Sequence, residues 1–167
     1  MLRTRILLYS MLLAGSCLAQ NEAAKPPAPE EKFFHLDFVV KEVEGGKTIN
    51  SRSYTMTAST EKNAPNASTR TGSRVQMPVP GSGFQVYDIG TNLDCRNVKE
   101  LPNGVTFGLG ADITSVASEA ASAPVVRTIR WSSPVIVPLR KPTVVFTSDD
   151  PSSRRQFQLE VTASPIR

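Results

Sequence analysis

The sequence predicts an all-β protein built from antiparallel sheets, arranged either as a sandwich or as an open meander. Hydrophobic and polar residues alternate with period two along nearly every extended segment, as in strands with one buried and one solvated face. Glycine, proline and asparagine separate these segments. The alanine- and serine-rich stretch 117–123 is too short for a free-standing helix, so we expect a loop or one helical turn there.

The first 19 residues have the three parts of a secretory signal peptide. Arg3 and Arg5 precede an apolar run over residues 6–13, and small residues close the segment at Ala19. We therefore expect export and cleavage before Gln20.

Cys17 leaves a second processing route open, because bacterial lipoproteins are cleaved just before a cysteine that carries acyl chains. Ala14 stands where such sequences prefer a large aliphatic residue. Membrane contact is expected only if Cys17 is lipidated. If the cut follows Ala19, Cys95 is the one remaining cysteine and cannot form an internal disulfide.

Residues 20–32 are expected to form a disordered, proline-rich tether, since they hold three prolines and no large apolar side chain. Residues 33–167 then form a single all-β domain, long enough for one core. The chain has 19 Lys and Arg against 15 Asp and Glu, and the signal peptide removes two of the arginines. This balance does not indicate a nucleic-acid-binding protein.

Turn residues predict two hairpins, one at Gly45–Gly46 and a stronger one at Pro102–Gly104. A polar loop at 61–68 and a break at 80–83 separate further segments. Pro134 must lie at a sheet edge or a bulge, because proline cannot donate to a ladder. The expected strands cover residues 34–41, 48–59, 69–79, 88–96, 105–114, 125–137, 143–146 and 156–163.

The alternation also predicts the core, because large apolar residues of one parity face the same side of each strand. Trp131 shares its parity with Ile129 and Val135 and is therefore expected in the core. The predicted core residues are Phe34, Leu36, Phe38, Tyr54, Leu93, Phe107, Leu109, Trp131, Val135, Phe157, Leu159 and Val161.

We expect no catalytic, cofactor-binding or metal-binding residues. His35 is the only histidine and has polar parity, so we expect it at the surface rather than in a catalytic triad. One histidine and one mature cysteine cannot supply the usual zinc ligands. Asp149 and Asp150 have no third acid at loop spacing, so we expect a solvated turn rather than a calcium site.

Three further patterns are expected to have no binding role. The glycines of Gly108–Gly110 precede no lysine or helix, so they relieve crowding in a strand rather than bind phosphate. The glycan-acceptor match at Asn66–Ser68 is too short to be informative. A late cluster of basic residues is expected to form an ordinary charged rim: Arg127, Arg130, Arg140, Lys141, Arg154 and Arg155.

Five short segments in the second half follow one another in a recognisable order: YDIGTNL at 87–93, NGVTF at 103–107, DITSV at 112–116, PVVRT at 124–128 and SPVIV at 133–137. This succession resembles the homology domain of bacterial secretins over about residues 84–163. The resemblance implies an exported β domain, periplasmic or associated with the outer membrane, that acts by contact with envelope or secretion-system proteins and possibly with itself. Because residues 34–80 replace the periplasmic modules that usually precede this domain, we expect a stand-alone module rather than a gated pore.

The alternative from a different class is a secreted β-sandwich that binds a glycan or another extracellular ligand through exposed aromatic side chains, with Trp131 as the candidate. An enzyme is not expected, since the sequence offers no nucleophile paired with a base.

Overall fold

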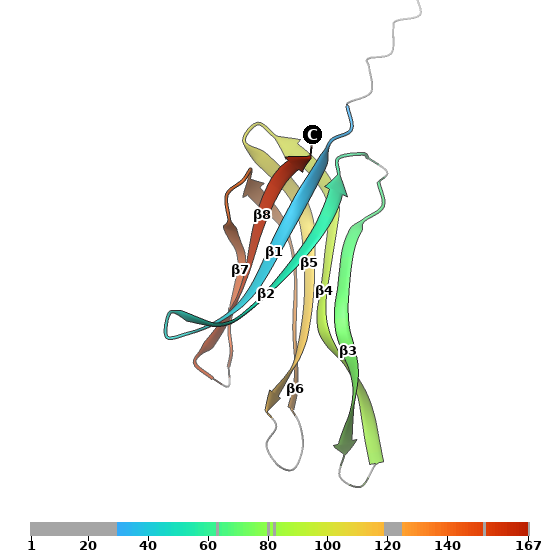
Figure 1. Cartoon of the computed structure of the whole chain (residues 1–167), viewed down its shortest axis with the longest axis vertical. Coiled ribbons are helices and arrows are strands. Elements are labelled where there is room, and N and C mark those ends of the chain that lie inside the picture. Colours follow the sequence, from blue (N-terminus) through green and yellow to red (C-terminus); the bar gives the residue numbers. More distant parts are fainter. Residues whose placement is uncertain are drawn as a thin grey trace, which may run out of the picture.

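The computed structural model describes residues 30–62, 64–79, 81, 83–118, 125–151 and 153–166 (Figure 1). The predicted signal peptide, Cys17 and most of the predicted tether lie outside these residues. The described residues form eight strands and no helix, which confirms the all-β class, and none of them belongs to a helix able to cross a membrane. The strands are β1 (Phe33–Glu44), β2 (Lys47–Ser59), β3 (Ala67–Val79), β4 (Gly83–Leu101), β5 (Gly104–Ser118), β6 (Val125–Pro138), β7 (Thr143–Asp149) and β8 (Arg155–Ile166).

The strands form two four-stranded antiparallel sheets, which pack against each other as a sandwich rather than an open meander. Sheet A has the strand order β2-β1-β8-β7, and sheet B has the order β3-β4-β5-β6. Most ladders join strands that follow one another in sequence, as short connections predict. The exception pairs β1 with β8, so that Phe33 lies opposite Ile166.

Alternate residues from both sheets fill one core. Ten of the twelve predicted core residues are buried, and Tyr54 and Trp131 lie partly buried at the margin of the core. Each fully buried large side chain stabilises the fold by about 1.5–3 kcal/mol relative to exposure. Cys95, Val105 and Val137 are also buried, at positions that continue the predicted alternation. The period-two pattern therefore identified the buried face of nearly every strand.

The two ends of the sandwich are built differently (Figure 1). Both connections that cross between the sheets, residues 60–66 and 139–142, lie at one end. Four of the five hairpin connections within sheets lie at the opposite end, and the fifth, between β4 and β5, lies at the same end as the crossing connections. Towards the opposite end, β4 leaves β5 after the pair Gly90–Thr114 and remains paired only with β3. We call residues 75–87 the β3–β4 arm, which projects beyond sheet A in Figure 1.

Gly72 and Gly90 lie opposite each other where this arm leaves the sheet. A Cβ atom on Gly90 would lie 2.1 Å from the backbone oxygen of Thr71, and one on Gly72 would lie 2.5 Å from that of Ile89. These distances are too short for any side chain, so the close approach of the two strands requires glycine at both positions.

The glycines singled out from the sequence are less constrained. A Cβ on Gly108 would approach Cγ of Arg96 to 3.1 Å, which agrees with the predicted relief of crowding. A Cβ on Gly110 would come no closer than 3.8 Å to any atom, so the prediction is wrong there.

Most strands run further than predicted, β4 by the largest margin, from Gly83 to Leu101 rather than over 88–96, and two further extensions replace a predicted loop or turn. β5 continues through Ser118 into the stretch expected to be a loop or a helical turn, and β7 continues to Asp149 rather than ending at Phe146. In both cases ladder pairing with the neighbouring strand extends the element beyond its apolar alternation. Residues 119–124 lie outside the described part of the chain.

Candidate interaction surfaces

His35 is a surface residue, as predicted. It lies on β1, and its Nε2 atom is 3.1 Å from Oδ1 of Asp37 on the same strand, with both side chains nearly half exposed. Among the described residues, no three His, Cys, Asp or Glu side chains are grouped so that they could hold a metal ion.

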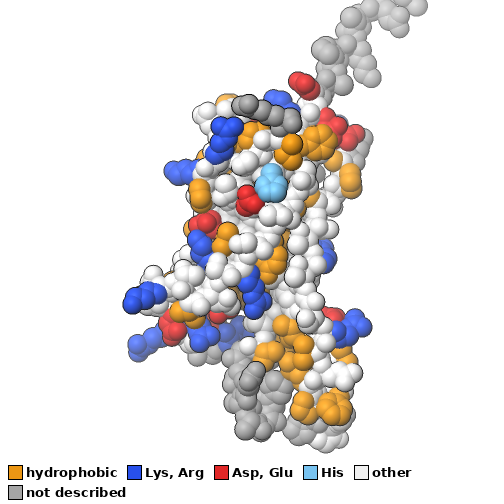
Figure 2. All heavy atoms as spheres, in the orientation of Figure 1, with side chains coloured by type: hydrophobic (Ala, Val, Ile, Leu, Met, Phe, Trp, Pro, Cys, Tyr) orange, Lys and Arg blue, Asp and Glu red, His pale blue; other side chains and the backbone are white. Residues whose placement is uncertain are grey.

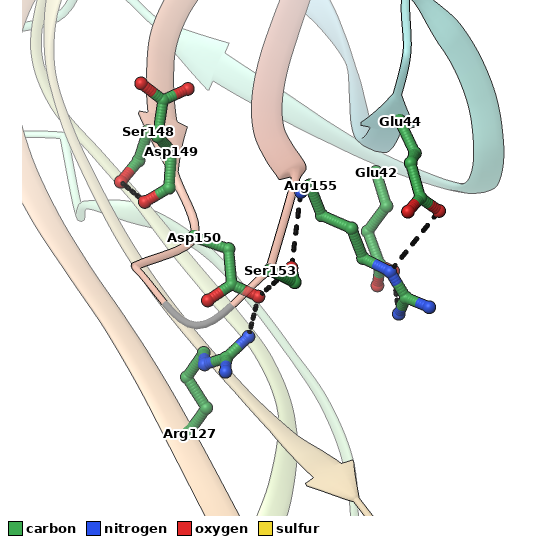
Figure 3. Close-up of polar contacts among 8 residues, drawn as sticks. All are labelled: Glu42, Glu44, Arg127, Ser148, Asp149, Asp150, Ser153 and Arg155. Carbon is green, nitrogen blue, oxygen red and sulfur yellow. Dashed lines mark hydrogen bonds and ion pairs between the residues drawn. The ribbon is translucent and has the colours of Figure 1, made fainter.

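Asp150 corrects the predicted solvated turn (Figure 3). Its side chain is only 2% exposed and forms an ion pair with Arg127. The hydroxyl of Ser153 donates a hydrogen bond of 2.5 Å to Oδ2 of the same carboxylate. Asp150 follows β7 in sheet A and Arg127 lies on β6 in sheet B, so this pair links the two sheets. Of the two aspartates, only Asp149 is exposed, as predicted.

The predicted basic rim is therefore wrong for Arg127, whose side chain is 23% exposed. The other members described by the structure are exposed, in agreement with the prediction. Arg130 pairs with Asp112 across the outer face of sheet B at 2.7 Å. Arg155 lies 3.8–3.9 Å from carboxylates of Glu42 and Glu44 (Figure 3). Each of these exposed pairs contributes little to stability.

Cys95 is buried and free, on the core side of β4. Burial, and to a smaller extent the neighbouring charge of Asp94, raises the pKa of its thiol to about 12. At neutral pH the thiol is protonated and inaccessible, which makes it a packing group rather than a nucleophile.

Trp131 is not an exposed platform. Its indole ring is partly buried against the core, with its centroid 5.1 Å from that of Phe146 on β7, at a tilted angle. This contact joins the margins of the two sheets, as expected for a core aromatic residue.

The edges of the sheets are the most extended polar surfaces of the fold. In sheet B the edge strands are β3 and β6, and no described strand pairs with the outer edge of either. Pro134 lies on the edge strand β6, as predicted, and Pro138 ends that strand. In β3, residues 67–77 contain no proline. An edge that keeps its amide donors can pair with a strand from another chain.

The strand count of each sheet permits such pairing to be repeated. With four antiparallel strands, the first and last strands of a sheet run in opposite directions. A second copy related by a rotation can therefore place its β3 beside β6 and keep the antiparallel alternation. An odd number of strands would place two parallel strands at this junction.

A second surface lies on the β3–β4 arm. Phe84 and Val86 are 74% and 49% exposed, and they share one face of β4. Pro78 lies opposite Phe84 on the neighbouring strand and is exposed as well. Figure 2 shows hydrophobic side chains gathered at this end of the molecule. The sequence predicts a strand at 69–79 and a break at 80–83, and it assigns no role to Phe84 and Val86. The absence of Asp, Glu, Lys, Arg and His from residue 75 to residue 87 is the signal that could have found this surface.

Comparison with solved structures finds a similar fold in secretin domains. The fold is similar to that of the type II secretin GspD from enteropathogenic Escherichia coli, with a TM-score of 0.52 and 9% sequence identity, over 83% of this chain and 70% of that one. PulD from Klebsiella pneumoniae is similar with a TM-score of 0.46 and 12% sequence identity, over 82% of this chain and 39% of that one. InvG from the Salmonella SPI-1 injectisome is similar with a TM-score of 0.45 and 10% sequence identity, over 82% of this chain and 62% of that one.

No family model matches the sequence, and no curated protein matches it. The chain nevertheless has a secretin-like fold, which confirms the resemblance inferred from residues 84–163 and extends it to most of the chain. The matched part includes strands of sheet A that the sequence resemblance did not cover, since 83% of the chain exceeds that range.

Proposed function

We propose that this chain is an exported, non-enzymatic β domain that acts by protein-protein contact in the bacterial cell envelope, including contact between its own copies. The observation that carries the proposal is the pair of unpartnered edge strands, β3 and β6, in a sheet whose strand count allows head-to-tail repetition. The secretin-like fold supports it, because GspD, which shares this fold, is a type II secretin. The neighbour PulD was solved together with PulS and PulC.

The surroundings of the described side chains that could bind or react, His35, Cys95 and Trp131, agree with a contact role. His35 has one carboxylate neighbour on its own strand, and the Cys95 thiol is buried. Trp131 packs against Phe146, so it offers no stacking platform for a glycan. Backbone groups at the sheet edges remain available for contact with another chain.

Disulfide trapping in the native envelope tests this pairing. Ser68→Cys on β3 is combined in turn with Thr128→Cys or Ser132→Cys on β6, all on the outer face of sheet B. Within one copy these positions are three strands apart, about 14 Å, which no disulfide spans. A disulfide between the two positions must therefore join two copies.

We expect one of these combinations to give covalent dimers and higher species. Ser68→Cys with Thr114→Cys, on the central strand β5, is the matched control and should give none. Ser68→Cys alone reports any disulfide with Cys17, and Cys95 is too buried to take part. If no combination links copies, and cross-linking of the envelope recovers no partner protein, the proposal is wrong.

A further inference from the structure

A β-bulge near the end of β4 brings two cations together on the outer face of sheet B. Arg96 lies opposite Gly108 of β5, and Lys99 lies opposite Thr106. Between these pairs β4 has one residue more than β5. In a regular strand, residues three apart point to opposite faces. The extra residue cancels this difference, so Arg96 and Lys99 share the outer face.

The core holds the bulge in place. Asn97 has a φ of 55°, in the left-handed region that residues other than glycine rarely adopt. Cys95 and Val98, on either side of it, are buried, with 1% and 8% exposure. Because each buried residue directly precedes one of the two cations, core packing keeps both cations on the outside.

Gly108 determines where the head of Arg96 lies. The Arg96 side chain passes over this glycine, since a Cβ there would lie 3.1 Å from Cγ and 3.5 Å from Nε of Arg96. The guanidinium then donates a hydrogen bond of 3.2 Å from Nη2 to Oγ of Ser132 on β6. Arg96 therefore crosses β5 and presents its remaining N–H donors near the edge of sheet B.

The other arginines of this face differ from Arg96 in their partners. Arg70, Arg74 and Arg130 each form an ion pair with an aspartate of the neighbouring strand, at 2.6, 3.0 and 2.7 Å. Neither Arg96 nor Lys99 forms an ion pair with any described residue. The two cations of the bulge are therefore available to a carboxylate from another molecule.

The hollows beside the bulge have a positive charge balance. One hollow is lined by both cations and by residues of β5 and β6, with no Asp or Glu. The other lies beside the loop 60–66, is lined by the same two cations, and adds Lys62 and Glu61. Glu100, next to the bulge, is already bound to Lys32 at 2.6 Å. Among the described residues that line the two hollows, three cations therefore stand against one carboxylate.

We propose that this bulge site, formed by Arg96, Lys99 and Ser132, binds an acidic segment of another envelope protein. Guanidinium and ammonium groups are the side chains that pair with carboxylates. Both cations are exposed, and a single exposed ion pair contributes little, so one small anion gains little here. A peptide with several carboxylates adds these small contributions on one chain. The inference rests on the proposed contact role, but not on the pairing of sheet edges.

Fluorescence anisotropy tests the proposal with the full chain and a labelled peptide in which Glu and Ser alternate. A peptide with Gln in place of Glu is the uncharged control. The test variant is Arg96→Gln with Lys99→Gln, and the matched control is Arg70→Gln with Arg74→Gln, which removes the same charge from the same face. We expect the test variant to weaken binding about fivefold or more, because two ion pairs with the peptide are lost. The control should weaken it less than about twofold.

A second pair of variants changes the path of Arg96 without changing the charge. Gly108→Val fills the space that Arg96 crosses to reach Ser132. Gly110→Val is the control on the same strand, where the nearest atom to an added Cβ is 3.8 Å away. We expect only Gly108→Val to weaken binding, by about threefold, because the guanidinium is displaced from its seat.

The outcomes separate this site from a general effect of charge. Equal weakening by the two double variants, or weakening by neither, would overturn the proposal, and so would equal binding of the Glu and Gln peptides. Displacement of the peptide by inorganic phosphate at the same concentration as its carboxylates would overturn it in favour of a small-anion site. Unchanged binding of Gly108→Val would show that the crossing of Arg96 to β6 is not part of the site. All of these results leave the disulfide test of β3 and β6 unaffected.

Discussion

The two sheets have the same number of strands and both are antiparallel, but they differ in length. The longest strand of sheet A has 13 residues, whereas β4 and β5 of sheet B have 19 and 15. Where the sheets overlap, alternate residues of each sheet are buried between them. In the arm, Phe84 and Val86 lie on the outer face of β4, the face that also carries Asp88 and Asn92, and they are exposed, whereas Met77 on the inward face of β3 is buried. The face of the strand on which an apolar residue lies therefore decides whether it joins the core.

The largest expected effect comes from the same change, phenylalanine to alanine, made once in each of the two regions of sheet B. Phe107, in the overlap, is 1% exposed, and Phe84, in the arm, is 74% exposed. Phe107→Ala should lower the free energy of unfolding by about 3–5 kcal/mol, because it leaves a cavity in the core. Phe84→Ala should change it by less than about 0.5 kcal/mol. Denaturant unfolding measures both, and similar losses for the two variants would show that the arm is packed in solution.

The boundary between the two regions is expected to be nearly as sensitive. Gly90→Ala places a Cβ 2.1 Å from the backbone oxygen of Thr71, so the strands must separate and unfolding should become easier by about 3 kcal/mol. Gly110→Ala is the control on the neighbouring strand, where the nearest atom is 3.8 Å away. That variant should be neutral or more stable by about 0.5 kcal/mol. A neutral Gly90→Ala would contradict the close approach of β3 and β4.

The link between the sheets gives a third test. Asp150→Asn removes a charge that is almost fully buried and leaves Arg127 without its carboxylate partner, so we expect a loss of about 2 kcal/mol. Asp149→Asn alters the adjacent, exposed carboxylate, which accepts a hydrogen bond from Gln156. Its effect should stay within about 0.5 kcal/mol. Equal unfolding midpoints for the two variants would show that Asp150 does not hold the sheets together.

The smallest effect concerns Cys95 and appears only at alkaline pH. In the unfolded chain the thiol ionises near its ordinary pKa of 9.0, whereas in the folded protein its pKa is about 12. The folded state therefore holds the proton more tightly, and the associated stability is complete below pH 9 and is lost as the pH rises towards 12. At pH 10 the loss should be about 1.4 kcal/mol relative to Cys95→Ala, with each variant referenced to its own stability at neutral pH.

The same thiol allows a direct check. A thiol reagent at pH 8 should not label Cys95 in the folded protein and should label it fully after denaturation. Rapid labelling of the native protein would contradict both the burial and the raised pKa of this group.

The sequence predicted the strands and the buried parity well, because both depend on local alternation. Phe34, Leu36 and Phe38 on β1 and Phe157, Leu159 and Val161 on β8 are buried as the pattern requires. The pairing of these two strands was not predicted, since no local signal connects segments at opposite ends of a domain. The same holds for the division of the strands between two sheets.

The surfaces were harder to predict than the core. The sequence predicts that two adjacent aspartates are solvated. Arg127 reaches Asp150 only because β6 passes the β7–β8 turn in the fold. Gly72 and Gly90 are separated by a whole hairpin, so their close approach depends on the register of the ladder. Conversely, the charge-free run of the arm is present in the sequence, and the exposure of Phe84 and Val86 follows from their place on the outer face of β4.

The pairing of β1 with β8 affects when the protein can fold. Phe34, Leu36 and Phe38 are among the first core residues to be synthesised, but their strand has β8 as one of its two neighbours. Sheet A therefore remains incomplete until the last strand is available. Contacts this distant along the chain slow folding, because the intervening loop must close before they form. Until β8 is synthesised, one edge of β1 lacks its native partner, and an unpaired strand edge of this kind is prone to aggregation.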